Sequence, residues 1–222
     1  MTNPVKPTLK TEILPLLILV AAIISSFYFY SHSPEIVPTH WNFAGEVDNW
    51  GSRSVAFVIP AVMVGIYILF LVFPFLDPKK EKYEQFSKVY HIFKGVMILF
   101  MAMLYFATSL NILGYNLPIG IIVPVGVGVL FIIMGNYMGK IKSNWFFGIK
   151  TPWTLSSEEV WNKTHRFGGK MFMLGGVLIA IDAFLPINYH LAVFMAAIIL
   201  VLLGTVGYSY LVYLKEKKPR NT

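Results

Sequence analysis

Six long apolar stretches constrain this chain more than any other feature of its sequence. A transmembrane helix needs about 20 consecutive, mostly apolar residues to cross the hydrocarbon core of a bilayer. With 56% hydrophobic and only 13% charged residues, the chain could not cover its apolar surface as a soluble domain. The expected spans are residues 13–30, 55–76, 92–113, 119–138, 167–185 and 191–214.

The basic residues predict the orientation of these spans. Of the 18 Lys and Arg residues, all but Arg53 fall before the first span, in the second and fourth connections or span ends beside them, or after the last span. Lys and Arg accumulate on the cytoplasmic side of a membrane protein. We therefore predict an all-α membrane protein, a bundle of six transmembrane helices with the N and C termini in the cytoplasm. The predicted basic tail is Lys215, Lys217, Lys218 and Arg220.

The composition also limits the chemistry. There is no cysteine, which excludes disulfides and thiolate-ligated metal sites. His40 and His165 are predicted on opposite sides of the membrane, and no nucleophile motif or metal-ligand spacing is present. We expect no catalytic residues, no metal and no cofactor, and thus a protein that is not an enzyme.

The connection between the first two spans, residues 32–54, is the first candidate site. Three acidic side chains make it net acidic in spite of Arg53, and its aromatic side chains could pack together or enter the headgroup layer. Two interpretations remain open: the loop captures a cationic amphipathic partner, or it is a compact hairpin that only caps helix ends. The candidate ligand-binding or toxin-binding residues are His40, Trp41, Asn42, Glu46, Asp48, Trp50 and Arg53.

The connection between the fourth and fifth spans, residues 139–167, is the second candidate site. Pro152 excludes a helix through its middle. Ser156 and Glu159 have the spacing of a capping box, so we predict a helix that starts at Ser157 and leads into the fifth span. The lysines at 140, 142 and 150 favour contact with anionic lipids of the cytoplasmic leaflet.

These two connections carry a resemblance to a known family. Residues 135–140, 144–155 and 160–166 closely resemble the SdpI family of bacterial membrane proteins. Residues 38–42 and 45–53 resemble an uncharacterised membrane domain that often precedes the SdpI segment. The matching cytoplasmic residues, expected to bind a partner or to form a structural motif, are Asn144, Gly148, Lys150, Thr151, Pro152, Trp153, Trp161, His165 and Arg166.

The resemblance implies a multi-pass protein of the bacterial plasma membrane that gives immunity to a secreted antimicrobial peptide toxin. It further implies signalling, in which a transcriptional repressor is held at the membrane, without direct contact with nucleic acid. The implied partners are membrane lipids, a peptide toxin outside and a repressor inside. The implied organisation is a two-span domain at 1–90 with a structured loop at 32–54, a third span and short turn at 91–118, and an SdpI-like segment at 119–222.

Two ionisable residues fall inside predicted spans, where charged groups are rare and mark function. Lys94 lies one turn into the third span and is expected to extend back to the cytoplasm. Asp182 lies near the outer end of the fifth span, either at the interface or inside the bundle beside Asn111, His190 or a cation. With the glycines and prolines of the fourth span, Asp182 supports an alternative function, a small transporter or channel for an ion or solute.

Overall fold

A computed structural model of the chain describes residues 4–217, so Lys218 and Arg220 of the predicted tail lie outside the described residues. Most of that part is helical, and short 3-10 helices η1 (Arg53–Phe57) and η2 (Lys80–Phe86) lead into the second and third long helices. The long helices are α1 (Leu9–His32), α2 (Val58–Leu76), α3 (Ser87–Ile112), α4 (Ile119–Met138), α6 (Glu158–Asp182) and α7 (Ile187–Lys217).

Five of these helices are long and apolar enough to cross a membrane, namely all but α6. The N-terminal half of α6 carries charged residues in each turn, including Glu158, Lys163 and Lys170, which lowers its apolar content. The expected fifth span, residues 167–185, therefore falls on a helix that does not meet the criterion of length and composition by itself.

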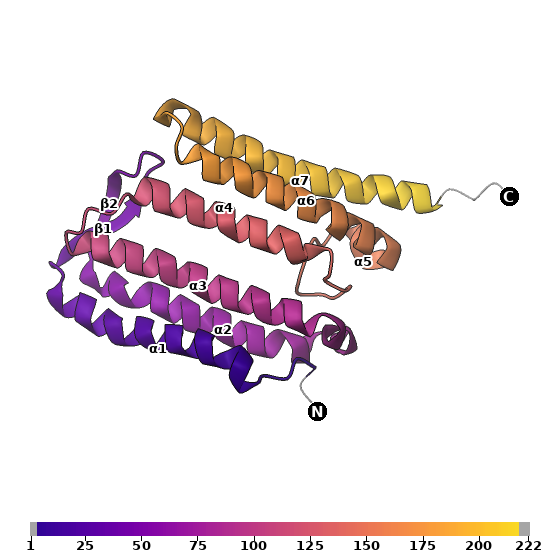
Figure 1. The fold of residues 1–222 in the computed structure, drawn as a ribbon, viewed down its shortest axis with the longest axis horizontal. Helices are drawn as coiled ribbons and strands as arrows, with labels where there is room; N and C mark the ends of the chain where they lie inside the picture. Colours follow the sequence, from indigo (N-terminus) through magenta and orange to yellow (C-terminus); the bar gives the residue numbers. More distant parts are fainter. Residues whose placement is uncertain (1–3, 218–222) are drawn as a thin grey trace.

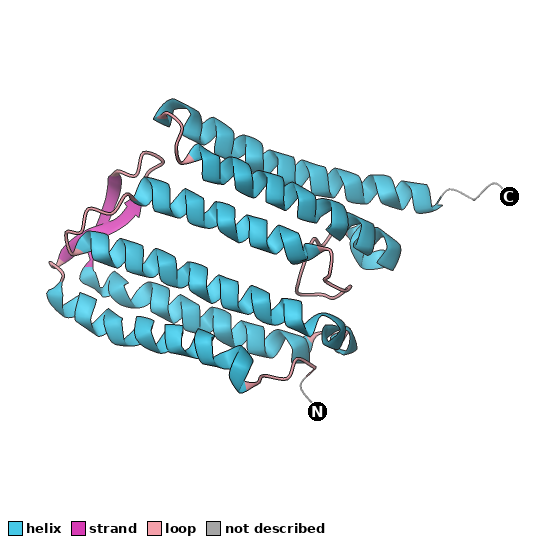
Figure 2. Cartoon of the chain, in the orientation of Figure 1, coloured by secondary structure: helices cyan, strands magenta, loops and turns pink. Residues whose placement is uncertain are grey.

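The long helices form two groups that lie side by side (Figure 1). Helices α1, α2 and α3 pack together, α4, α6 and α7 pack together, and contacts between α3 and α4 join the groups. Both ends of the described chain lie at one end of the bundle, together with η2, the 139–151 loop and the short helix α5 (Pro152–Ser156). The connection after α1 lies at the opposite end (Figure 2).

That connection corrects the all-α prediction, because it forms a two-stranded antiparallel sheet of β1 (Ile36–Trp41) and β2 (Val47–Ser52). The side chain of Asn42 builds the turn between the strands. Its Oδ1 accepts hydrogen bonds from the backbone N–H groups of Ala44 and Glu46 at 2.9 and 3.0 Å. Gly45 has a φ of +77°, which a glycine adopts without strain. Short-range turn chemistry thus closes the hairpin.

One sequence prediction for the 139–167 connection is wrong. No helix runs through Pro152, as expected, but a short helix starts there, because Pro152 is the first residue of α5, where its missing N–H has no intrahelical partner to lose. Thr151 caps this helix by accepting a hydrogen bond from the Thr154 N–H. The cap of α6 is Ser157, which accepts from the Val160 N–H, so the expected Ser156–Glu159 capping box is not formed.

Glycines allow α4 and α6 to approach closely. A Cβ built on Gly128 would lie 2.5 Å from the Gly176 carbonyl oxygen, and one on Gly135 would lie 2.5 Å from the Gly169 carbonyl oxygen. Small residues serve the same purpose in membrane helix pairs, where packing replaces the hydrophobic effect as the driving force. α6 therefore packs closely against the apolar helix α4 on one side and against α7 on another.

We predict that Gly135→Ala lowers the free energy of unfolding by about 1–3 kcal/mol, because the added methyl group overlaps the α6 backbone. Thermal unfolding in detergent, followed by circular dichroism, measures the change. Gly207→Ala in α7 is the matched control, since nothing lies within 4 Å of its added Cβ. Equal effects of the two substitutions would contradict the close α4–α6 contact.

Candidate functional site

A cavity of about 200 Å³ lies beneath the outer hairpin. Its walls come from β1, η1, and the adjoining ends of α1, α2 and α3. Two of the seven outer candidate residues, Trp41 and Arg53, line it. The Arg53 guanidinium lies 4.8 Å from the centre of the Tyr30 ring and donates a hydrogen bond to the Ser33 carbonyl oxygen at 3.4 Å. The cavity is therefore mostly apolar, with one aromatic and one cationic candidate side chain, Trp41 and Arg53, in its wall.

The other outer candidates lie on the exposed part of the hairpin. The His40 Nδ1 and Asp48 Oδ1 atoms are 2.5 Å apart and join the two strands. The Asn42 amide donates to the Glu46 carboxylate at 3.1 Å. Trp50 is 58% exposed. Within residues 4–217, no group of three or more His, Asp and Glu side chains is placed to hold a metal ion.

The tip of the hairpin contacts the C-terminal group of helices. The Phe43 carbonyl oxygen lies 3.1 Å from His190 Nδ1, and the Leu185 carbonyl oxygen lies 2.9 Å from His190 Nε2. Since both acceptors are carbonyl oxygens, both ring nitrogens must carry hydrogen to donate to them. The Phe43 ring also packs on Phe194, with 5.8 Å between ring centres. The hairpin thus connects the two helix groups at its end of the bundle.

At the end of the bundle opposite the hairpin, the SdpI-like motif folds into a compact cap, predicted to be cytoplasmic. Asn144 is fully buried at its centre. Its Oδ1 accepts from the Phe146 and Phe147 backbone N–H groups at 2.9 and 2.6 Å. Its Nδ2 donates to the carbonyl oxygens of Lys142 and Phe147 at 2.8 and 3.1 Å. One side chain therefore satisfies backbone groups that the loop itself leaves unpaired.

Gly148 lets the loop pass directly over a buried histidine. It has a φ of +107°, and a Cβ there would lie 2.2 Å from His165 Nε2. That nitrogen accepts a hydrogen bond from the Ile149 N–H, and Nδ1 lies 2.9 Å from the Trp161 carbonyl oxygen. The Trp161 indole stacks on His165 and donates to the Ile141 carbonyl oxygen at 2.9 Å. These partners fix the neutral tautomer that carries hydrogen on Nδ1.

The remaining motif residues divide into a buried part and an exposed part. Thr151 donates to the Ser209 hydroxyl of α7 at 3.2 Å, and the Trp153 ring packs on Tyr210. Lys150 and Arg166 are exposed, with the Lys150 ammonium near the Trp145 and Phe146 carbonyl oxygens. The structure therefore brings all nine motif residues into one region and gives most of them a role in its folding.

Asp77 is a buried residue of this region that sequence reasoning missed. It is only 2% exposed, and its carboxylate accepts from the Tyr83 hydroxyl and the Trp145 backbone N–H, both at 2.9 Å. Because Trp145 belongs to the 139–151 loop, Asp77 connects the two helix groups at the capped end of the bundle. The sequence feature that could have identified Asp77 is its position between an apolar stretch and Pro78.

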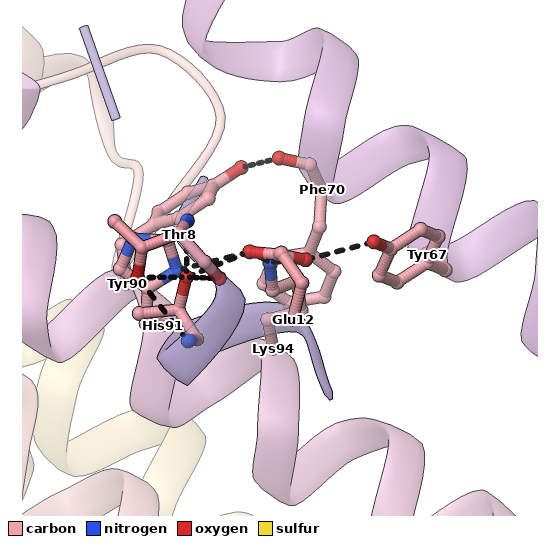
Figure 3. A network of polar contacts seen from close by, with 8 residues as sticks. Thr8, Glu12, Tyr67, Phe70, Tyr90, His91 and Lys94 are labelled. Atoms are coloured by element: carbon pink, nitrogen blue, oxygen red, sulfur yellow. Dashed lines mark hydrogen bonds and ion pairs between the residues drawn. The ribbon is translucent and has the colours of Figure 1, made fainter. Parts of the chain in front are cut away.

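Lys94 corrects a further prediction, because its side chain turns to a partner inside the bundle and does not extend along the helix end to solvent. It is 1% exposed, and its ammonium lies 2.5 and 2.6 Å from the two carboxylate oxygens of Glu12 (Figure 3). The Tyr67 hydroxyl donates to the same carboxylate at 2.7 Å, and His91 Nδ1 lies 3.8 Å from it. This pair joins α1 to α3, and Glu12 was not among the sequence candidates.

Asp182 is buried, with 4% of its surface exposed, and its Oδ1 has no hydrogen-bond partner among residues 4–217. Neither of its two expected side-chain neighbours bonds to it. The Asn111 amide donates to the Leu117 carbonyl oxygen, and His190 engages the two carbonyl oxygens described above. Asp182 is the last residue of α6 and is not among the residues that line the cavity beneath the hairpin.

The fold defines a multi-pass membrane protein. Its distinctive sequence motifs lie in two connections, at opposite ends of the helices. Residues 140–210 match the model of the SdpI/YfhL protein family, and residues 17–64 match that of a domain of unknown function (DUF1648). The match of residues 140–210 confirms the resemblance to this family that the sequence predicted.

A curated relative extends the match over nearly the whole chain. The chain is 29% identical over 207 residues to the "Immunity protein SdpI" of Bacillus subtilis (strain 168). The aligned part covers 93% of this chain and 98% of that relative. No solved structure matches the chain. The family and the apolar helices together place this protein in the membrane.

We predict that Lys94→Met destabilises the protein strongly, because it leaves the Glu12 carboxylate buried without its cation. Breaking a buried ion pair costs about 3–5 kcal/mol, whereas replacing both partners with apolar residues is often neutral. Glu12→Leu combined with Lys94→Met should therefore recover most of the lost stability. Unfolding in detergent with increasing urea compares the variants, and a double variant as unstable as the single one would refute the pairing.

Proposed function

We propose that this chain is an immunity protein that protects the cell carrying it from a secreted antimicrobial peptide toxin. The observation that carries the proposal is the match to an immunity protein along 93% of the chain. A match of this extent includes both the outer hairpin and the cytoplasmic cap. The proposed mode of action is binding rather than catalysis, so the protein is not an enzyme and uses no cofactor.

The proposed place of toxin contact is the hairpin and the cavity beneath it. This region combines the negative charges of Glu46 and Asp48 with the aromatic surfaces of Trp41 and Trp50. Such a surface suits a cationic amphipathic peptide through charge complementarity and apolar contact. His40, Asn42 and Arg53 support it by joining the strands, closing the turn and lining the cavity.

The proposed topology has six transmembrane spans with both termini in the cytoplasm. It counts α6 as a span because α6 runs alongside α4 and α7 (Figure 1), so α4 and α7 shield part of its surface from lipid. The positions of the basic residues support the orientation. The division of the chain into the parts 1–90, 91–118 and 119–222 belongs to the same proposal. The hairpin at 32–54 then faces outward and the 139–167 loop faces the cytoplasm.

The cytoplasmic cap is the proposed contact for a repressor protein and for anionic lipids. Its exposed residues are the available contacts, among them Lys150, Pro152 and Arg166. The buried residues Asn144, Trp161 and His165 support the shape of this surface from below. The repressor would be the nucleic-acid-binding component, so the proposed protein needs no direct contact with nucleic acid.

The alternative function, a small transporter or channel, gains less support. It relied on an irregular fourth span, but α4 continues without a break through Pro124 from Ile119 to Met138. Asp182 is buried, but it does not line the cavity beneath the hairpin. Transporter sites are typically formed where helices are interrupted near the middle of the membrane. We therefore favour immunity.

We predict that Trp41→Ala and Trp50→Ala reduce protection at least tenfold, since aromatic anchors in a binding surface commonly contribute more than 1.4 kcal/mol each. The measurement is survival of a sensitive host that expresses each variant and is challenged with peptides secreted by the species of origin.

Trp145→Ala is the matched control, because Trp145 is similarly exposed, at 48%, but lies at the cytoplasmic end. Immunoblots of membrane fractions show whether each variant reaches the membrane in equal amount. Full protection by both hairpin variants at normal membrane levels would refute the outer contact site.

A further inference from the structure

A groove of about 710 Å³ lies at the capped end of the bundle. Its walls are η2 and the first two turns of α3 on one side, and the last turn of α4 with the loop that follows on the other (Figure 1). Contacts between α3 and α4 join the two helix groups, so the groove lies along that junction. Its volume falls in the usual range of ligand sites, about 300–1,000 Å³.

Three lysines without an acidic partner give this groove a positive rim. Lys88, Lys140 and Lys142 line it and are exposed, and the single carboxylate in the lining is that of Glu84. None of the three lysines forms an ion pair within residues 4–217. The Lys140 ammonium lies 5.0 Å from the centre of the Tyr137 ring. The rim therefore complements an anion.

Two lysines close to the groove already have partners in the protein. Lys82 of η2 forms an ion pair with Glu158 of α6. Lys79 donates a hydrogen bond to the Ser143 hydroxyl at 2.8 Å. These two lysines connect the 77–86 segment to the C-terminal helix group, whereas the lysines of the groove keep their charge for an external partner.

The inner part of the groove is apolar. Ile92 and the Tyr137 ring line it, and both are half-buried. They belong to α3 and α4, two of the helices that are long and apolar enough to cross a membrane. A soluble anion or an acidic protein would meet the lysines but not this inner surface. A phospholipid has a phosphate for the rim and an acyl chain for the apolar part, and basic pockets between transmembrane helices bind such lipids.

We propose that this groove binds one anionic phospholipid, with its phosphate on Lys88, Lys140 and Lys142 and the start of an acyl chain along Ile92 and Tyr137. Because Lys88 belongs to one helix group and the other two lysines follow the last helix turn of α4, the bound phosphate connects the groups at the capped end. The inference rests on the part of the proposed function that gives the cap a lipid contact, and not on immunity.

The test is native mass spectrometry of the full chain in a neutral detergent, titrated with phosphatidylglycerol or with phosphatidylcholine of the same acyl chains. The unaltered chain should bind the first phosphatidylglycerol at least tenfold more tightly than phosphatidylcholine. Lys88→Gln, Lys140→Gln and Lys142→Gln combined should weaken phosphatidylglycerol binding at least tenfold and leave phosphatidylcholine binding unchanged. The reason is that each lysine near an anionic lipid contributes about fivefold to the affinity.

The matched control combines Lys10→Gln, Lys215→Gln and Lys217→Gln, which removes the same charge from exposed positions that do not line the groove. Equal weakening by the two triple variants, or no preference of the unaltered chain for phosphatidylglycerol, would overturn the proposal. Displacement of the lipid by equimolar glycerol phosphate would overturn it in favour of a soluble anion, and displacement by a tetraglutamate peptide in favour of an acidic protein.

Survival of cells that express the unaltered chain separates this site from the proposed immunity. Protection without a preference for phosphatidylglycerol would reject the lipid site alone. The expected lipid preference in a chain that does not protect would support the lipid site and reject only immunity.

Discussion

A lipid bilayer offers peptide groups no hydrogen-bonding partner, and the rest of this structure follows from that constraint. Backbone that crosses the hydrocarbon must satisfy its own polar groups, which a helix does within one segment. The hairpin and the irregular loop are accordingly confined to the two ends of the bundle (Figure 2). Two charged groups that enter the bundle, Glu12 and Lys94, form a directly bonded pair.

The two ends of the helix bundle differ in structure: one is closed by a buried loop, and the other has a cavity under the hairpin. At the capped end, Asn144, His165 and Asp77 pair the backbone or side-chain groups of a loop that has little regular structure. At the other end, the hairpin contacts both helix groups and leaves a cavity beneath it. A closed cap and an open cavity suit the proposal that the ligand binds at the hairpin end. Because α3 contributes to the cavity and leads from η2 beside the cap, it provides a physical connection between the two ends.

The sequence predicted much of the helical framework, because apolar length is a local property. The expected span 119–138 coincides with α4, and 55–76 differs from α2 by three residues at its start. Local patterns could not identify Glu12, because its partner Lys94 lies 82 positions away. The same distance explains the wrong expectation for Lys94, whose local position indicated only a path to the cytoplasm. Trp41 and Arg53 were among the candidates, but Tyr105 was not, since a cavity-lining tyrosine within an apolar helix has no distinguishing local pattern.

The central claim is that the hairpin and its cavity face the outside of the cell. The chain contains no cysteine, so single cysteines can be introduced as Asn49→Cys in the exposed hairpin and Ser156→Cys in the cytoplasmic cap. Labelling of intact cells with a membrane-impermeant maleimide measures which cysteine is accessible. The account predicts rapid labelling at position 49 and labelling at position 156 only after the membrane is permeabilised. The reverse pattern, with position 156 labelled in intact cells and position 49 protected, would contradict it.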